Sequence, residues 1–249
     1  MGFWFIVERV MRSSDITVFI LDARMPELSR NIELEERAKR LRVPILYVLN
    51  KMDLVSPDKL DELRENYPEA LLVSGVKNIG IKDLKTKLLI MGKRLGNKSP
   101  KIGIVGYPNV GKSAIINAMA HRARAKVSIK AGTTRGVQFI RAGSLKILDT
   151  PGVVPFEDKE SKLGMIAAKN PEKLRNPEHV AIEILEKLLK NNKPAIEKYS
   201  GAHLIDEEPH SILEQIGRHR GFLKKGGSVD EIKTAITLVR DWQRGKIRD

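Results

Sequence analysis

The stretch that decides the fold is GYPNVGKSAIINAM, residues 106–119. From Gly106 to Ser113 it follows the Gly-x-x-x-x-Gly-Lys-Ser spacing of a phosphate-binding loop. The β-branched run at 101–105 predicts a strand before the loop, and the residues after the loop predict a helix. Glycines in such a loop let backbone N–H groups face phosphates at the positive end of the helix dipole. The stretch therefore predicts a nucleoside triphosphate site in an α/β domain.

The side chains around this loop predict how phosphates and a metal ion are held. Lys112 is expected to reach the β- and γ-phosphates, and the Ser113 hydroxyl is expected to bind Mg²⁺. Further along, LKILDTPG places Asp149 at the end of a predicted strand, where a carboxylate can hold Mg²⁺ through water. The Gly152 N–H is expected to contact the γ-phosphate. The site is thus predicted to bind a nucleotide together with Mg²⁺.

A polar segment between these two motifs, KAGTTRG at 130–136, is predicted to be a switch whose threonine joins the Mg²⁺ ligands. Thr134 is the first candidate for this ligand, and Thr133 is the alternative.

The tetrapeptide NKMD directly follows a predicted buried strand and is expected to read the base. The Asp53 carboxylate can accept hydrogen bonds from the N1–H and the exocyclic amine of guanine, and adenine offers no such pair of donors. Lys51 can lie against the base plane, and Asn50 can tie this loop to the phosphate loop. Ser74 and the Gly75 amide, at the end of the next predicted strand, can support the same base. A lone NKMD can also be a helix cap, but together with a phosphate loop it favours guanine.

The motifs stand in an unusual order. In a Ras-like GTPase the phosphate loop comes first and the base-reading motifs come last, whereas here residues 50–53 precede residues 106–113. The connector GNKSPK at 96–101 would join the former last helix to the former first strand. Such a rearrangement is possible because the termini of a domain often lie close together at the surface. The sequence therefore predicts a circularly permuted G domain.

The chain is predicted to be an α/β P-loop NTPase with a mostly parallel sheet, followed by a small all-helical C-terminal domain. Short β-branched runs alternate with helical patterns through the first part of the chain, and only helical patterns follow. We expect the G domain to cover residues 1–160 and the helical domain residues 161–249. A capping box from Ser228 to Glu231 predicts the start of the last helix. The predicted strands cover 16–21, 44–50, 70–74, 101–106, 137–142 and 145–149.

Composition limits the classes of function. Hydrophobic residues make up 41% of the 249 residues and charged residues 31%, which suffices to bury a core. The net charge of +14 favours a polyanionic partner through phosphate contacts, although a solvated basic face explains it equally well. The chain has no cysteine, which excludes disulfides, thiolate metal sites and a cysteine nucleophile. No apolar run reaches the ~20 residues of a membrane span, so we expect a cytoplasmic location.

With this motif order, the sequence resembles the circularly permuted GTPases of the YlqF/YawG type, in the MMR1/HSR1 group. ILDARMPELSRN at 20–31 looks like that family's leader motif, and residues 219–247 look like the end of its C-terminal helical domain. The resemblance covers nearly the whole chain. It implies a GTP- and GDP-binding protein and slow GTPase in ribosome assembly, mostly of the large subunit. It further implies ribosomal RNA or a large-subunit precursor as the partner, with release timed by hydrolysis. No membrane partner is expected, and the free protein is expected to be a monomer.

The residues that would drive hydrolysis are not evident from the sequence. Val153 follows DTPG, where Ras-like GTPases keep the glutamine that orients the attacking water. The family is known for this replacement, and its bacterial members are thought to use a histidine from an N-terminal PGHM-like segment, but the first histidine here is His121. We therefore assign no catalytic base, and name only Lys112 and Thr134 as contributors. Asn109 matches an asparagine that helps bind K⁺ in related GTPases, where a cation can neutralise developing charge.

Two alternatives to a GTPase switch stay open. One is a nucleotide-gated RNA-binding scaffold with negligible hydrolysis, and the other is a permuted GTPase that acts on the small subunit or on transfer RNA. Candidate contacts to RNA phosphates in the tail are Arg218, Arg220, Lys224 and Lys225. The predicted nucleotide contacts are Asn50, Lys51, Met52, Asp53, Ser74, Gly75, Asn109, Val110, Gly111, Lys112, Ser113, Ala114 and Gly152.

Overall fold

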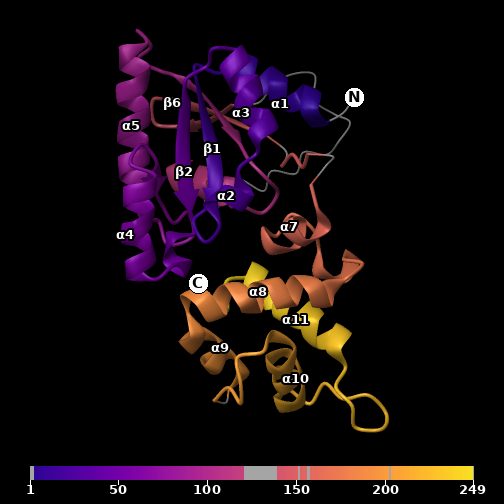
Figure 1. Cartoon of the computed structure of the whole chain (residues 1–249). Coiled ribbons are helices and arrows are strands. Elements are labelled where there is room, and N and C mark those ends of the chain that lie inside the picture. The colour runs from indigo at the N-terminus through magenta and orange to yellow at the C-terminus, as the bar shows by residue number, and fades with distance from the viewer. Residues whose placement is uncertain (1–2, 121–138, 151, 156–157, 202, 249) are drawn as a thin grey trace. The chain divides into compact units, whose positions relative to one another are not determined.

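The computed structural model describes residues 3–120, 139–150, 152–155, 158–201 and 203–248. The chain divides into two compact units, residues 1–156 and residues 157–249 (Figure 1). In the described residues, the first unit combines a sheet with helices and the second is built of helices. Each unit has its own core, and the two are described in turn.

The first unit is built on a six-stranded sheet in the order β3-β2-β1-β4-β6-β5. All neighbouring strands are parallel except β5, which pairs antiparallel with β6 at the edge. Each strand overlaps one of the six predicted segments, and the mostly parallel sheet is confirmed. The strands are β1 (Ile16–Asp22), β2 (Ile45–Asn50), β3 (Leu71–Leu72), β4 (Lys101–Val105), β5 (Phe139–Ala142) and β6 (Leu145–Asp149).

Helices cover both faces of this sheet, and Figure 1 shows α1 and α3 on one side and α5 on the other. On the first side, Phe19 of β1 lies in one apolar cluster with Met11 of α1 and Leu34 of α3. Ile32, the first residue of α3, is 65% exposed and does not join this cluster. The helices of this unit are α1 (Phe3–Arg12), α2 (Pro26–Ser29), α3 (Ile32–Arg40), the 3₁₀ helix η1 (Met52–Leu54), α4 (Pro57–Asn66), α5 (Ile81–Arg94) and α6 (Lys112–Ala120).

The centre of the sheet is the place where a ligand site is expected. β1 and β4 are adjacent and parallel, but the chain continues from β1 toward β2 and from β4 toward β6, on opposite sides. Ligands of open α/β sheets bind at the carboxyl ends of the strands where the direction reverses in this way. Gly106, directly after β4, has φ 146°, and a Cβ there would lie 2.6 Å from the Ile20 carbonyl oxygen. Only glycine lets the loop leave β4 so close to β1.

The second unit packs its helices around α8 and α11 (Figure 1). Trp242 of α11 is fully buried, and its Nε1 donates a hydrogen bond to the Met165 carbonyl oxygen at 3.0 Å. This residue is therefore a core residue, as its place in the sequence pattern indicates. The helices of this unit are α7 (Glu160–Met165), the 3₁₀ helix η2 (Pro171–Lys173), α8 (Pro177–Asn191), α9 (Lys193–Ser200), α10 (Pro209–His219) and α11 (Glu231–Gln243).

The last helix begins differently from the predicted capping box. The N-cap of α11 is Asp230, whose side chain accepts a hydrogen bond from the Lys233 backbone N–H at 3.1 Å. Ser228 instead lies in the loop between α10 and α11, where its carbonyl accepts from the Lys224 N–H at 2.8 Å. The predicted cap is wrong because the bridge between Leu223 and Val229 closes this loop and leaves Asp230 as the first residue free to cap the helix.

Candidate functional site

The predicted phosphate-binding loop connects β4 to α6 at the carboxyl edge of the sheet. Asn109 and Gly111 both have positive φ angles, 58° and 100°, so the loop turns sharply before the helix begins. A Cβ at Gly111 would lie 2.1 Å from the Asn50 side-chain nitrogen. Glycine is therefore required at position 111 for two reasons: the positive φ angle and the Asn50 side chain that packs against it. Val110 is fully buried, whereas Asn109 is exposed.

Lys112 lies inside this loop. Its side chain is mostly buried, and its Nζ donates hydrogen bonds to the carbonyl oxygens of Gly106 at 3.1 Å and Tyr107 at 2.7 Å. Burial lowers the pKa of Lys112 to about 8, and the negative charge of Asp149 opposes this shift. An ammonium group at the N-terminus of a helix, bonded to backbone carbonyls, is well placed to bind phosphate oxygens in their stead.

Asp149 has the environment that a Mg²⁺ site requires. It ends β6, and its Oδ1 atom is buried with no hydrogen-bond partner among the described residues. Burial raises its pKa, while Lys112 and the Thr150 N–H lower it less strongly. A buried carboxylate oxygen without a partner suits a hydrated Mg²⁺ ion, because oxygen atoms are the ligands this ion prefers. Ser113, in the first turn of α6, is exposed, so Asp149 and Ser113 fit the predicted ion.

Two predicted contributors cannot be compared with the structure. Thr134 and the alternative Thr133 lie outside the described residues, so the third Mg²⁺ ligand stays a prediction.

Asn50 links the predicted base-reading loop to the phosphate loop. It ends β2, is 2% exposed, and its Nδ2 donates a hydrogen bond to the Val110 carbonyl oxygen at 2.8 Å. The Gly75 N–H in turn donates to Asn50 Oδ1 at 3.0 Å. A Cβ at Gly75 would lie 2.8 Å from the backbone nitrogen of Ile115 in α6, so this loop packs directly on the helix. One amide side chain therefore joins three loops, and the predicted tie between Asn50 and the phosphate loop is confirmed.

The Ser74 and Gly75 groups are already used within the protein. The Gly75 N–H is bonded to Asn50, and the buried Ser74 hydroxyl accepts a hydrogen bond from the Lys77 N–H at 3.0 Å. Both residues thus shape the loop beside the site, and a direct contact with a base stays a prediction.

Lys51 and Asp53 follow Asn50 in a tight turn. Lys51 adopts the left-handed conformation with φ 67°, and its Nζ donates to Asp22 Oδ2 at 2.8 Å. Asp53 lies half-buried in the 3₁₀ helix η1. The Met52 N–H donates to the Val73 carbonyl oxygen at 3.1 Å, which anchors this helix to the segment after β3. The left-handed residue turns the chain so that η1 starts directly at the sheet edge.

The segment after β6 packs against the phosphate loop. A Cβ at Gly152 would lie 2.5 Å from the Pro108 backbone nitrogen, so the two loops touch. The Val153 side chain, which follows, is 2% exposed and belongs to the apolar cluster around Phe19. Asn31 Nδ2 donates a hydrogen bond to the Val153 carbonyl oxygen at 3.4 Å and holds this segment in place. Val153 is therefore a core residue and carries no catalytic group.

The four predicted RNA contacts differ in their surroundings. Arg220 is paired with Asp241, at 3.4 Å, and stacks over the Tyr199 ring at 4.1 Å. Arg218 forms an exposed ion pair with Glu214 at 2.6 Å. Lys224 and Lys225 are exposed in the loop between α10 and α11.

Sequence reasoning missed two residues that support the site. They are Asp22, at the end of β1, and Arg24, and both are buried. Asp22 forms ion pairs with Arg24 and with Lys51. The signal in the sequence is Asp22 itself, because an acidic residue that ends a buried parallel strand marks the edge of the sheet where ligands bind.

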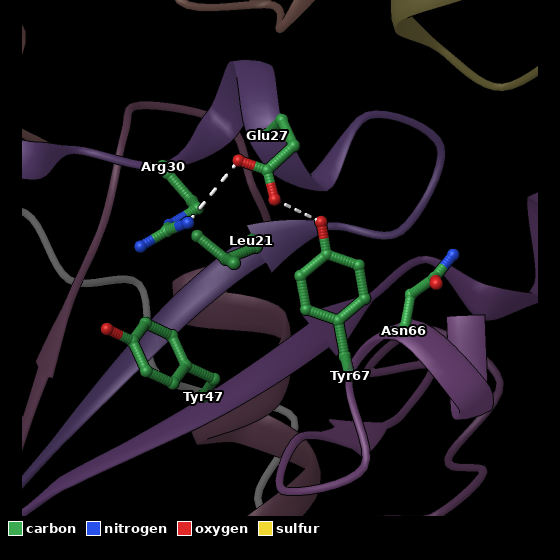
Figure 2. A pocket seen from close by; sticks show the side chains of 6 residues that line it. All are labelled: Leu21, Glu27, Arg30, Tyr47, Asn66 and Tyr67. Carbon is green, nitrogen blue, oxygen red and sulfur yellow. Dashed lines mark hydrogen bonds and ion pairs between the residues drawn. The ribbon is translucent and has the colours of Figure 1, made fainter.

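A cavity with other residues opens elsewhere in the first unit (Figure 2). Its volume is about 490 Å³. Glu27 lies between two partners, since the Tyr67 hydroxyl donates to its carboxylate and Arg30 pairs with it at 3.4 Å. None of the predicted nucleotide contacts lines this cavity, whose lining residues are Leu21, Glu27, Arg30, Tyr47, Asn66 and Tyr67.

The fold matches that of solved circularly permuted GTPases. GDP-bound YlqF from T. maritima superposes with a TM-score of 0.63 at 22% identity, over 97% of this chain and 95% of that chain. The GNP-bound form superposes with a TM-score of 0.61. The chain therefore has the circularly permuted P-loop GTPase fold, with a helical C-terminal part.

Sequence comparison gives the family. Residues 101–215 match the MMR_HSR1 family, described as 50S ribosome-binding GTPase. Ribosome biogenesis GTPase A of Priestia megaterium is 32% identical over 260 residues, which cover 97% of this chain and 89% of that protein. The chain belongs to this family of GTPases.

Other relatives are longer than this chain. An uncharacterized GTP-binding protein of Methanocaldococcus jannaschii is 39% identical over 97% of this chain, which spans 65% of that protein. Nucleolar GTP-binding protein 2 of Pneumocystis carinii is 29% identical over 98% of this chain, which spans 52% of that protein. In the described residues, no helix has the length and apolar character needed to cross a bilayer.

Proposed function

We propose that this chain binds GTP with Mg²⁺, hydrolyses it slowly, and acts as a switch in ribosome assembly. The observation that carries the proposal is the Asn50 side chain, which hydrogen-bonds both to Val110 of the phosphate loop and to the Gly75 loop. A residue that joins the base-reading and phosphate loops suits a site in which one nucleotide spans both. Membership of a GTPase family supports the same function.

Each side chain has a proposed task in nucleotide binding. Asp53 accepts two hydrogen bonds from guanine, and the Lys51 stem lies against the base plane. Lys112 exchanges its carbonyl partners for the β- and γ-phosphates. Ser113 binds Mg²⁺ directly and Asp149 holds it through water, which would give the Asp149 Oδ1 atom a partner. When bound, Mg²⁺ neutralises charge on the phosphates.

The switch would respond to the γ-phosphate. In this proposal Thr134 joins Mg²⁺ and the Gly152 N–H contacts the γ-phosphate only in the GTP-bound state. Because Gly152 packs on Pro108 of the phosphate loop, loss of the γ-phosphate would change the position of the segment that leads to Val153. Asn109 is the proposed K⁺ contact beside the phosphates.

The proposed partner is the large ribosomal subunit or its precursor, bound through ribosomal RNA. The family description and the name Ribosome biogenesis GTPase A support a ribosomal partner, and the net charge of +14 supports contact with RNA. Lys224 and Lys225 are the stronger candidates for phosphate contacts, because Arg220 and Arg218 already pair with carboxylates. We propose that the protein works in the cytoplasm as a monomer.

Equilibrium titration tests the guanine site. The protein should bind GDP far more tightly than ADP in the presence of Mg²⁺, and Lys112→Ala should abolish the part of the affinity that depends on phosphates. ADP binding as tight as GDP binding would contradict a guanine site.

The rival function is a nucleotide-gated RNA-binding scaffold with negligible hydrolysis. The burial of Val153 favours it, because no water-orienting side chain stands at that position. Multiple-turnover phosphate release, with and without ribosomal subunits and in K⁺ against Na⁺, separates the two functions. Release under any of these conditions supports the GTPase, and none under all of them supports the scaffold.

The choice of target has its own test. The GTP-loaded protein should sediment with the large subunit when the two subunits are supplied separately. Sedimentation with the small subunit, or with transfer RNA, would instead support the third possibility.

A further inference from the structure

Three charged side chains form a buried cluster at the carboxyl end of β1. Asp22 is fully buried and Arg24 is 1% exposed. The Arg24 Nε donates to Asp22 Oδ1 at 3.0 Å, and the Arg24 Nη2 donates to Asp22 Oδ2 at 2.8 Å. Lys51 Nζ donates to the same Oδ2 at 2.8 Å. One carboxylate therefore holds two cations, a fully buried guanidinium and an ammonium whose side chain is 15% exposed.

The cluster is held rigidly at the edge of the sheet. Asp22 lies opposite Asn50 in the register of β1 and β2, and its N–H donates to the Ser29 hydroxyl at 2.9 Å. The next residue, Ala23, donates its N–H to the Asn50 carbonyl oxygen at 2.8 Å. The carboxylate thus sits on a backbone that is fixed directly beside the predicted base-reading loop.

The neighbouring positive charges favour the ionised form of Asp22. Burial alone would raise its pKa, but the positive charges of Arg24 and Lys51 outweigh burial and hold the pKa well below its usual range. Loss of that negative charge would leave two cations facing each other in a buried place, which is strongly unfavourable.

Lys51 is consequently fixed at both ends. Its backbone adopts a left-handed conformation, with φ 67°, and its ammonium is bound to Asp22. A free lysine side chain samples many rotamers, and ordering it when a ligand binds costs conformational entropy. Here the ammonium is already bound to Asp22 before any ligand arrives, so part of that cost is met in the free protein.

We propose that Asp22 is a positioning residue for base recognition: with Arg24 it fixes the Lys51 stem as a preformed platform for the guanine ring. This inference rests on the proposed function, since it assigns a partner to the same site. Asp22 itself does not touch the nucleotide. It acts through Lys51, and it lowers the cost of ordering that side chain when the base binds.

A double-mutant cycle tests whether Asp22 acts through Lys51. Asp22→Asn and Lys51→Met should each weaken GDP binding about tenfold, and the double variant should be no weaker than Lys51→Met alone. If Asp22→Asn weakens binding about tenfold again in the Lys51→Met background, the two residues act independently and the proposal is overturned.

A second readout separates base positioning from general support of the site. Tripolyphosphate can occupy the phosphate loop but has no base. Its dissociation constant, obtained from competition with GDP, should therefore be the same for Asp22→Asn and for the wild type. A parallel loss of tripolyphosphate affinity would mean that Asp22 merely supports the whole site, and would overturn the proposal.

Folding needs a matched control. Glu35→Gln makes the same carboxylate-to-amide change at another buried carboxylate, which is bound by Arg30 at 3.0 and 2.8 Å. It should lower the stability but leave GDP affinity at the wild-type value. If Asp22→Asn fails to fold because Arg24 is stranded, Asp22→Asn combined with Arg24→Gln takes its place in the cycle.

The proposed function and this inference fail differently. A wild-type protein that shows no preference for GDP over ADP sinks the guanine site itself. A wild-type protein that binds GDP tightly but gives an additive cycle sinks only the role of Asp22.

Discussion

Replacement of Asn50 by aspartate tests the link between the two halves of the site. The Asn50 Oδ1 accepts from the Gly75 N–H at 3.0 Å, and its Nδ2 donates to the Val110 carbonyl oxygen at 2.8 Å. Asn50→Asp keeps the size of the side chain and the first bond. The substitution replaces the side-chain NH₂ group, which donates to the Val110 carbonyl, by an oxygen atom that can only accept while the carboxyl is ionised.

The magnitude follows from burial. At 2% exposure, neither the Val110 carbonyl nor the new oxygen can turn to water. Removal of one partner from a buried hydrogen bond costs about 1–3 kcal/mol in the free energy of unfolding. The nucleotide depends on the same contact, so GDP affinity should fall about ten- to hundredfold, because about 1.4 kcal/mol is tenfold.

The defect should depend on pH with a definite sign. Burial and the facing carbonyl would raise the pKa of the introduced carboxyl above the ordinary value of about 3.9. A group whose pKa is higher in the folded state favours folding when it is protonated. The stability deficit against wild type should therefore be small below about pH 4 and grow as the pH rises through the folded-state pKa.

Urea unfolding at several pH values and GDP titration at neutral pH measure both effects. Asn176→Asp is the matched control, because Asn176 is exposed at the N-cap of α8, where aspartate is equally acceptable. Wild-type GDP affinity in Asn50→Asp would refute the idea that this side chain couples the loops.

Three further changes test other parts of the molecule. Asp53→Asn should weaken GDP binding and favour xanthosine diphosphate in competition titrations; unchanged preference would contradict base reading by this carboxylate. Trp242→Phe strands the buried Met165 carbonyl and should lower the free energy of unfolding by about 1–3 kcal/mol in urea, whereas no change would contradict its core role. Burial raises the pKa of Asp241, but hydrogen bonds from Lys246 and Tyr199 outweigh it and lower the pKa. That carboxylate thus stabilises the fold above its unfolded pKa of about 3.9, so the deficit of Asp241→Asn should shrink as pH falls below about 4, and a constant deficit would contradict this.

Much of the fold followed from local patterns. The runs at 16–21 and 101–106 became the central strands β1 and β4, because a strand covered on both faces needs apolar residues along most of its length. Ser56 caps α4, with Pro57 in the first turn, because both residues favour a helix start locally. These features depend mainly on neighbours along the chain, although the local pattern alone misplaced the cap of α11.

Predictions that depended on contacts beyond the immediate neighbours were less complete. The cap of α11 was misplaced by two residues, because the Leu223 to Val229 bridge decides where the preceding loop ends. Arg220 looked like a free surface charge in the sequence, yet it is paired with Asp241. Asp241 lies 21 residues from Arg220 in the chain, so no local pattern could reveal that pair.

The sequence by itself determined the motif order, the strands and the phosphate loop, because glycine spacing and apolar periodicity are local properties of the chain. Only the tertiary structure decided how those motifs work together. It brings Asn50 to Val110, sixty residues away, and sets Lys51 on Asp22, twenty-nine residues away. It also buries Val153 in the core and leaves the Asp149 Oδ1 without a partner among the described residues. Side-chain contacts across a sheet depend on strand order and register, which spacing along the chain does not encode.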